Sequence, residues 1–348
     1  MKKPLKVLLS VVLGIALVVV AFFSYIHLSN SEVDRQLRLS GFIVHALVDL
    51  DSEESLIAAS IASMSATHEL RHDSVVTTEE RFIRTRDGND LRVLIFRPTN
   101  PRPNATGLLW IHGGGYAVGS PDQEFITARR FIETANVVVV SPAYTLSGIA
   151  PFPAAFNDCF DTLVWMKENA EELGINPNQL FVGGVSAGGG LAAAVVLHAR
   201  DSGLVNVAFQ MPLYPMINPR MDTPSAIGNE SLIWNSRRNL IAWRLYLGDL
   251  FGTNHIPTHA AVALETDFSN LPPAFTFIGD LDPFYDDIIG WVNNMRIDGV
   301  RVEFHRFRGA YHGFEVIVPN AGISRVAIEK KLAAFKYATE HFFAYQTP

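Results

Sequence analysis

The strongest sign of covalent chemistry in the chain is a serine that lies between small residues. The segment 184–188 reads Gly-Val-Ser-Ala-Gly and matches the pattern G-x-S-x-G. The apolar run Leu180–Gly183 precedes it, and a run of glycines and alanines follows it. A strand, a tight turn and a helix in this order would expose the Ser186 hydroxyl above a sheet, because glycine permits a sharp turn and a close approach of strand and helix. We therefore predict that Ser186 is a nucleophile.

A second glycine-rich segment, His112–Gly115, directly follows the apolar run Leu108–Ile111. Acyl transfer creates an oxyanion, and each preorganised N–H donor lowers its barrier by about 3 kcal/mol or more. Consecutive glycines bring backbone N–H groups close to a ligand, because no Cβ stands in the way. We expect these groups, together with the N–H of Ala187, to form an oxyanion hole.

An acid and a base are predicted near the ends of two later strands. Asp282 follows the apolar run 274–278, and His312 follows the run 302–307. Sites in α/β sheets lie at the carboxyl ends of strands, and the order serine, aspartate, histidine is that of α/β-hydrolases. The histidine would accept the serine proton while the aspartate orients the histidine. Three nearby carboxylates are rival acids: Asp280, Asp286 and Asp287.

Composition and missing motifs argue against several other functions. The 348 residues are 48% hydrophobic, which suffices for a sizeable core, and carry a net charge of −7. Without a large Lys/Arg cluster the sequence does not indicate a nucleic-acid-binding protein. The single cysteine, Cys159, excludes an intrachain disulfide and a C-x-x-C pair. Neither a His-Glu-x-x-His zinc motif nor a Walker P-loop occurs, so no metal site is predicted.

The elements that position these residues follow from the apolar pattern. Two strands, 81–84 and 91–96, flank the turn signal at 87–90. Helical stretches at 154–169 and 187–200 separate some of the later strands. Continuous apolar runs indicate strands buried on both faces, as in a parallel sheet, and we expect an α/β fold with helices on both sides. The runs are 108–111, 137–140, 180–182, 207–211, 274–278 and 302–304.

The N-terminus is unusually apolar. An uncharged run of 20 residues, 7–26, follows lysines at positions 2, 3 and 6. As a helix it would span about 30 Å, the hydrocarbon thickness of a bilayer. We expect residues 1–28 to be a membrane anchor of a single-pass protein, with the N-terminus in the cytosol and the catalytic domain outside the cytoplasm. A long, cleaved signal peptide is the alternative.

Two further segments are predicted to cover the site. Residues 29–75 mix polar and apolar positions at helical spacing, which indicates two amphipathic helices. The stretch at about 216–264 is too long for a simple connection, and Trp234 and Trp243 within it suit an inserted cap. Together with Phe42, these tryptophans suggest an apolar pocket. Residues 76–345, including the insertion, are expected to form one catalytic domain.

Taken together, these segments resemble the hormone-sensitive-lipase-like esterases, which are the H-G-G-G (family IV) carboxylesterases of the α/β-hydrolase superfamily. The resemblance runs from about residue 80 to the C-terminus. It rests on the segments 112–115, 144–155, 184–189, 271–273, 282–284 and 312–314. An N-terminal anchor would also be similar to the arylacetamide-deacetylase branch of this family.

The resemblance implies a fold, a site and a reaction. The fold is an α/β-hydrolase with a helical cap, and the site is a Ser186–Asp282–His312 triad. Members hydrolyse carboxylic esters of mostly short to medium acyl chains through an acyl-enzyme and without a cofactor, which implies a small lipophilic ester as substrate. The implied oxyanion hole uses the N–H groups of Gly114, Gly115 and Ala187, with Gly113 as a further candidate.

The sequence departs from the family pattern in two places. Val185 stands where the family usually has an acidic residue. The segment 144–150 reads Tyr-Thr-Leu-Ser-Gly-Ile-Ala in place of the usual Tyr-Arg-Leu-Ala-Pro-Glu-His. Neither change touches the triad, but both remove groups that could support it and so affect the rate and the pH optimum.

Two other functions are weighed against ester hydrolysis. Receptors that resemble this family keep the pocket and lose catalysis, typically with loss of the histidine, and an amidase or peptidase would use the same triad. The presence of all three triad residues favours the ester hydrolase. No feature of the sequence indicates an oligomeric state.

Overall fold

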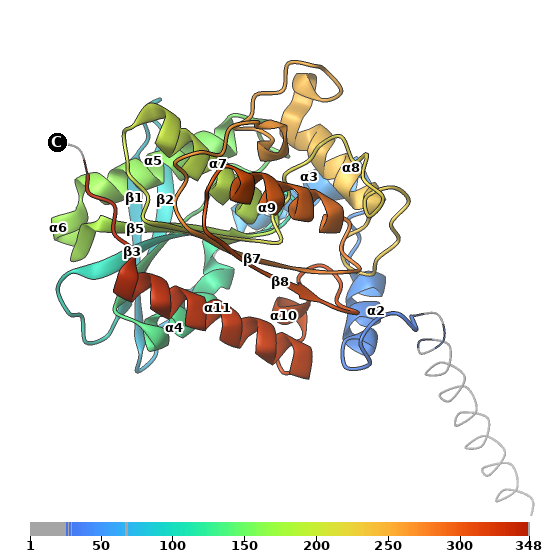
Figure 1. Ribbon diagram of the computed structural model, residues 1–348, viewed down its shortest axis with the longest axis horizontal. Coiled ribbons are helices and arrows are strands. Elements are labelled where there is room, and N and C mark those ends of the chain that lie inside the picture. The colour runs from blue at the N-terminus through green and yellow to red at the C-terminus, as the bar shows by residue number, and fades with distance from the viewer. Residues whose placement is uncertain (1–25, 27, 29, 67–68, 347–348) are drawn as a thin grey trace, which may run out of the picture.

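The centre of the molecule is an eight-stranded sheet, shown in Figure 1. The computed structural model describes residues 26, 28, 30–66 and 69–346. The strand order is β1-β2-β4-β3-β5-β6-β7-β8, with β2 antiparallel to β1 and β4 and all other pairs parallel. All eight segments predicted as strands lie in this sheet, so the predicted α/β fold is confirmed. The strands are β1 (Val76–Arg84), β2 (Asp90–Pro98), β3 (Ala105–Ile111), β4 (Val137–Pro142), β5 (Ile175–Val185), β6 (Phe209–Leu213), β7 (Ala274–Gly279) and β8 (Val302–Phe307).

Helices cover both faces of the sheet. Every residue of β3, β4, β6 and β7 is buried, which explains their continuous apolar sequences. In Figure 1, α4 and α11 lie on one face, and α5, α7 and α9 lie on the other. The helices around the sheet are α4 (Phe125–Thr134), α5 (Ala154–Glu168), α6 (Ala170–Leu173), α7 (Ala187–Ser202), α9 (Tyr285–Ile297), α10 (Phe314–Ile317) and α11 (Gly322–His341).

The strand pairing brings distant loops together at one edge of the sheet. Ile111 at the end of β3 pairs with Gly184 near the end of β5, and Val185 pairs with Leu213 of β6. Gly279 of β7 likewise pairs with Phe307 of β8. Because these strands are parallel, the loops that follow them leave the same edge. We call these loops, residues 112–119, 185–187, 214–216, 280–284 and 308–313, the catalytic edge.

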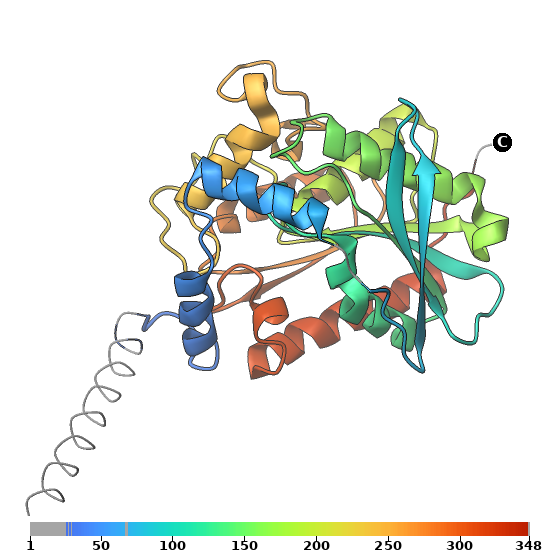
Figure 2. The same cartoon turned by 180° about the vertical axis from the view of Figure 1, so that it is seen from behind.

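Helices from two separate parts of the chain lie together beside this edge. They are α2 (Arg38–Leu47), α3 (Glu53–Ser65) and α8 (Ser236–Leu247), and both views show them at the end of the molecule away from the C-terminus (Figures 1 and 2). Arg238 of α8 is 1% exposed and donates to Asp51 Oδ1 and to the Val48 carbonyl, each at 2.9 Å. We call α2, α3 and residues 216–264 the helical cover.

The helical cover is built from two regions of the chain. The region 29–75 contains the two helices α2 and α3, and the segment 216–264 contains α8 and two short 3-10 helices, η2 (Gly248–Leu250) and η3 (Val262–Leu264). A third 3-10 helix, η1 (Pro121–Glu124), precedes α4. The division of the chain into an anchor, cap helices and a catalytic domain stays a prediction.

The expected membrane span requires a correction. Within the residues that the structure describes, no helix has the length and apolar character needed to cross a bilayer. The segment predicted as an anchor lies almost wholly outside those residues. On this finding the prediction of a single-pass membrane protein with an extracytoplasmic catalytic domain is wrong. The prediction rested on the length and apolar composition of the run 7–26.

Candidate active site

Ser186 occupies a strained turn between β5 and α7. Its φ of 58° and ψ of −121° are unusual for a residue with a side chain. A Cβ on Gly188 would lie 2.2 Å from the Ile111 carbonyl oxygen, and one on Gly184 would lie 2.4 Å from the Gly188 oxygen. Only glycine therefore fits on either side of the turn. The Ser186 N–H donates to the Leu213 carbonyl at 3.0 Å and fixes the turn on the sheet.

A chain of hydrogen bonds joins Ser186, His312 and Asp282. The Ser186 hydroxyl lies 2.7 Å from Nε2 of His312, and Nδ1 of His312 lies 2.6 Å from Oδ2 of Asp282. The other carboxylate oxygen of Asp282 accepts the Phe284 N–H at 2.9 Å. The three side chains come from the loops after β5, β8 and β7 and are all buried. In this arrangement Nδ1–H of the imidazole donates to the carboxylate and leaves Nε2 free to accept the serine proton.

The rival carboxylates have other partners. Asp280 accepts the Gly309 N–H at 2.6 Å, and Asp286 accepts the Ser225 N–H at 2.8 Å. Asp287 accepts a hydrogen bond from the Asn218 amide at 2.8 Å, and burial raises its pKa to about 6. Among the described hydrogen bonds, none joins any of these three groups to His312. Asp282 is thus the carboxylate that the structure places against the imidazole.

The glycine loop after β3 lies directly against the serine turn. A Cβ on Gly113 would lie 3.0 Å from the Val185 carbonyl oxygen and 3.3 Å from Cβ of Ser186. Gly114 and Gly115 have φ values of 122° and 60°, which favour glycine. Four backbone N–H groups have no hydrogen-bond partner within the described part of the chain: those of Gly113, Gly114, Gly115 and Ala187. They remain available to an oxyanion beside Ser186.

His112 supports this loop in a way that its sequence motif did not reveal. Its ring stacks on Tyr144, with centroids 4.2 Å apart, and its Nδ1 lies 2.8 Å from the Gly113 carbonyl oxygen. The Tyr144 hydroxyl donates to the His112 carbonyl at 3.1 Å. Burial lowers the pKa of His112 to about 4, so the imidazole is neutral at pH 7. Its role here is to position the glycines.

The helical cover contacts the same loop through α3. The Ser60 hydroxyl is within 2.5 Å of the Ala117 carbonyl oxygen, and the Ser63 hydroxyl accepts the Gly119 N–H at 3.3 Å. A Cβ on Gly148 would lie 2.3 Å from the Ser60 hydroxyl oxygen. Gly148 belongs to the segment that departs from the family pattern, and its missing side chain lets α3 approach. A single serine in this helix carries no pattern that would have predicted this contact.

One aromatic residue of the cover reaches the site. The Trp234 side chain lies so close to Gly115 that a Cβ there would be 2.3 Å from Cη2 of the indole. The centre of its ring is 6.2 Å from that of His312. Trp243, by contrast, packs in the core against Tyr116, with ring centres 5.5 Å apart. Phe42 on α2 is half-buried. Of the three predicted pocket aromatics, only Trp234 is shown beside the catalytic groups.

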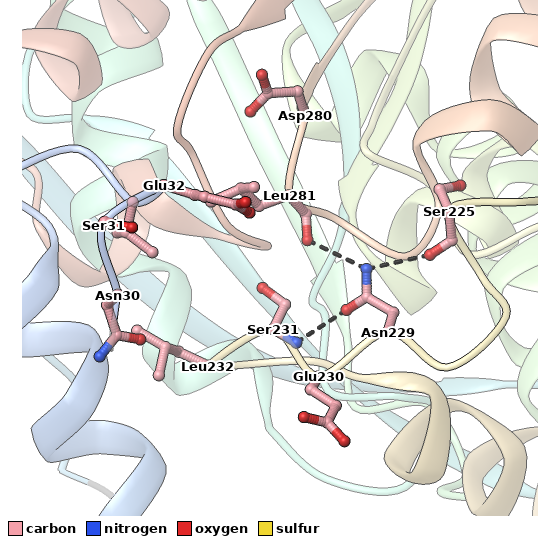
Figure 3. Close-up of a pocket in the computed structure, with 11 residues that line it drawn as sticks. Asn30, Ser31, Glu32, Ser225, Asn229, Glu230, Ser231, Leu232, Asp280 and Leu281 are labelled. Atoms are coloured by element: carbon pink, nitrogen blue, oxygen red, sulfur yellow. Dashed lines mark hydrogen bonds between the residues drawn. The ribbon is translucent and has the colours of Figure 1, made fainter. Parts of the chain in front are cut away.

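A pocket of about 470 Å³ lies next to the loop that carries Asp282. Figure 3 shows that segments 30–32, 229–232 and 280–281 surround it. The Asn229 amide donates to the Ser225 carbonyl at 3.0 Å and to the Leu281 carbonyl at 3.4 Å, which attaches the cover to the acid loop. None of the three triad side chains lines this pocket.

The described residues contain no group of three or more His, Cys, Asp or Glu that could hold a metal ion. Cys159 is buried in α5 with a free thiol, and burial raises its pKa well above the ordinary value.

Known proteins resemble this chain in sequence and in fold. A family model described as alpha/beta hydrolase fold matches residues 108–316. Carboxylesterase NlhH of Mycobacterium tuberculosis is 33% identical over 266 residues, which cover 75% of this chain and 82% of that protein. Ethyl acetate hydrolase of Pseudomonas putida is 30% identical over 235 residues, covering 66% and 73%. The solved structure of a bacterial heroin esterase has a TM-score of 0.79 at 30% identity, over 89% of this chain and 99% of that one.

Proposed function

The chain belongs to the α/β-hydrolase fold family, within its H-G-G-G carboxylesterases, and is a serine ester hydrolase; from this premise we propose that Ser186, His312 and Asp282 are its catalytic triad. The observation that carries the assignment is the unbroken line of two hydrogen bonds, 2.7 and 2.6 Å long, from the serine hydroxyl to the buried carboxylate. The receptor-like alternative is not favoured, because the relatives are esterases and the triad is complete.

The proposed reaction has two halves. Ser186 Oγ attacks the ester carbonyl carbon while its proton moves to Nε2 of His312, and the carbonyl oxygen becomes an oxyanion. The oxyanion accepts hydrogen bonds from the N–H groups of Gly114, Gly115 and Ala187, with Gly113 as a further candidate donor. When this intermediate collapses, the C–O bond to the alcohol breaks, and His312 returns the proton to the leaving alkoxide oxygen. The product of this half is an acyl group on Ser186.

Water completes the second half. His312 takes a proton from the water as its oxygen attacks the acyl carbon, and the same N–H groups hold the new oxyanion. Collapse breaks the bond to Ser186 Oγ, which recovers its proton from His312, and the carboxylic acid leaves. Asp282 keeps the proton-bearing Nδ1 turned away from the serine and stabilises the imidazolium in both halves.

Trp234 supports a preference for short to medium acyl chains. Its indole lies close to both Gly115 and His312. An ester carbonyl that is attacked by Ser186 would sit beside these two residues. Residues 29–75 and 216–264 would act as the cap that limits the space available to the acyl group. The Pseudomonas putida relative is named for ethyl acetate, a small ester.

Rates on p-nitrophenyl esters from acetate to palmitate test this preference. We expect the rate to peak at short or medium chains, and we expect Trp234→Ala to move the peak to longer chains while Trp234→Phe moves it less. A wild-type rate that climbs steadily to palmitate would contradict the proposal.

Hydrolysis of p-nitrophenyl butyrate by single variants tests the triad. Ser186→Ala and His312→Ala should each lose most of the activity, since residues that act as a unit fail together. Asp282→Asn should lose about 10⁴-fold in kcat through the wrong imidazole tautomer. Asp280→Asn and Asp286→Asn are the controls. If either control lost the activity and Asp282→Asn kept it, the assignment of the acid would be wrong.

A further inference from the structure

A buried charged cluster beneath the site takes no part in the steps above. Glu315 on α10 is 1% exposed, Lys331 on α11 is 3% exposed, and Glu124 of η1 is 9% exposed. Burial of a charge is costly unless an opposite charge or hydrogen bonds compensate for it. The opposite charges of these three side chains must therefore offset the free-energy cost of burying them. A costly cluster next to the active site suggests that it has a role there.

The Lys331 ammonium lies over an aromatic surface and is attracted to both carboxylates. Its Nζ lies 5.9 Å from the ring centre of Trp110 and 5.7 Å from that of Phe131. The Trp110 indole N–H donates to Glu124 at 2.8 Å. Burial raises the pKa of Glu315 and lowers the pKa of Lys331, and the attraction between the two charges opposes both shifts. Lys331 thus offsets part of the cost of burying a negative Glu315 and is its counter-charge.

Tyr214 connects Glu315 to the triad. Its hydroxyl donates to Oε1 of Glu315 at 2.7 Å, and its ring lies edge-to-face against His312, with centres 5.1 Å apart. Tyr214 has a φ of 34°, which is strained for a residue with a side chain, so its conformation needs outside support. It directly follows Leu213, whose carbonyl accepts the Ser186 N–H. One tyrosine therefore contacts the imidazole and adjoins the strand end that holds the serine turn.

We propose that Glu315 is a positioning residue of the esterase: with Lys331 as its counter-charge, it fixes Tyr214 against His312 and adds a second negative charge that favours the imidazolium formed during each half of the reaction. The inference rests on the proposed triad. Asp282 acts on the imidazole by direct contact, whereas Glu315 acts through Tyr214 and by attraction over distance.

The groups that face Glu315 decide the sign of its effect. The second oxygen of its carboxylate, Oε2, has no hydrogen-bond partner within the described residues. Burial raises the pKa of Glu315, and three groups oppose this rise: Lys331 and protonated His312 through their positive charges, and Tyr214 through its hydrogen bond. Attraction between opposite charges is mutual, so a negative Glu315 also stabilises the imidazolium that forms in each half of the reaction. The titratable groups around the cluster are Tyr214, His312, Lys331, Glu124 and, beside Lys331, Arg130.

The decisive variant is Glu315→Gln, which keeps the size of the side chain and an acceptor for Tyr214 but removes the charge. We expect kcat on p-nitrophenyl butyrate to fall about fivefold with KM within about twofold, since the loss affects a charge that forms in the transition state. The acid-side midpoint of kcat/KM against pH should move down by about half a pH unit, because His312 loses a nearby negative charge. The exposed Glu329→Gln on α11 is the control and should change neither quantity.

The double variant Glu315→Gln/Lys331→Met separates charge from packing. Glu124 still pairs with Lys331 in Glu315→Gln, so the double variant leaves Glu124 without its counter-charge and should be less stable than Glu315→Gln, whereas its kcat should stay near that of Glu315→Gln. A wild-type kcat and midpoint in Glu315→Gln would overturn the proposal, as would a kcat that falls further together with stability in the double variant. Ser186→Ala, measured in the same assay, distinguishes failure of the triad from failure of this inference. Activity in Ser186→Ala would refute the triad. An inactive Ser186→Ala together with wild-type kinetics in Glu315→Gln would refute only the role of Glu315.

Discussion

The catalytic edge and the helical cover meet over Ser186, but they are held in different ways. At the catalytic edge the backbone decides the geometry: glycines permit the turn, strand ends fix the loops, and a Cβ at Gly184 or Gly188 would clash with carbonyl oxygens. In the cover, side chains from distant segments make the contacts, as Ser60 does with Ala117 and Arg238 does with Asp51. A change at the edge should therefore damage chemistry first, and a change in the cover should first alter stability or substrate choice.

The largest effect is expected from one added methyl group at the edge. In Gly188→Ala the new Cβ would lie 2.2 Å from one backbone oxygen and 2.3 Å from another, so the serine turn must move. We expect kcat to fall at least about 100-fold, the scale of losses that follow small displacements of reacting groups. The matched control is Gly290→Ala on α9, where a Cβ would meet nothing within 4 Å. Similar activity in both variants would refute the claim that the backbone sets this geometry.

The edge should also be sensitive to acid through His112. Its pKa is lowered by burial to about 4 in the folded protein, against 6.5 for an unperturbed histidine. Between these two pKa values, the unfolded chain therefore binds a proton at His112 that the folded chain does not bind. The contribution of the neutral His112 to the free energy of unfolding is fully present above pH 6.5. About 3 kcal/mol of it is lost as the pH falls towards 4.

Urea unfolding at pH 7 and pH 4.5 checks this sign. The free energy of unfolding should fall less with acidification in His112→Asn than in the wild type, with exposed His341→Asn as the control. The pKa of Asp287, raised by burial to about 6, gives an opposite trend, with stability lost as the pH rises through 6. Asp287 is present in both the wild type and His112→Asn, so its contribution cancels when their pH dependences are compared. Equal pH dependence in wild type and His112→Asn would show that the ring is not buried in its neutral form.

The smallest effect is expected where the cover contacts the edge. Ser60→Ala removes the hydroxyl that donates to the Ala117 carbonyl and should lower the free energy of unfolding by about 1 kcal/mol, the usual value of a hydrogen bond. Because Ala117 lies in the glycine loop, kcat should also fall by a few-fold. Ser65→Ala on the same helix loses only a local bond to the Ile61 carbonyl and serves as the control. If Ser60→Ala altered neither quantity relative to Ser65→Ala, the cover would not support the loop.

The same contrast explains what could be predicted from the sequence. Local sequence patterns were enough to predict the sheet, the serine turn, the glycine loop and the order of the triad residues. Each of these depends on neighbouring residues and on where the apolar strands end. With the help of the family motif, Asp282 was preferred among four carboxylates; it lies against His312, and its role as the acid stays a prediction. The positions of Ser60, Arg238 and Glu315 could not be predicted, since their partners lie 57, 187 and 101 residues away in the chain. The membrane prediction was wrong, since no helix within the described residues is long and apolar enough to span a bilayer.

The most direct test of the account is covalent labelling of the serine. A fluorophosphonate reacts with a serine only when a base removes its proton and an oxyanion hole accepts the phosphoryl oxygen, so it reports the assembled edge. Intact-mass spectrometry should show one adduct on the wild-type protein, and peptide mapping should place it on Ser186. Ser186→Ala should stay unlabelled, and His312→Ala should label far more slowly. An adduct on another residue, or equal labelling of wild type and Ser186→Ala, would contradict the proposed nucleophile.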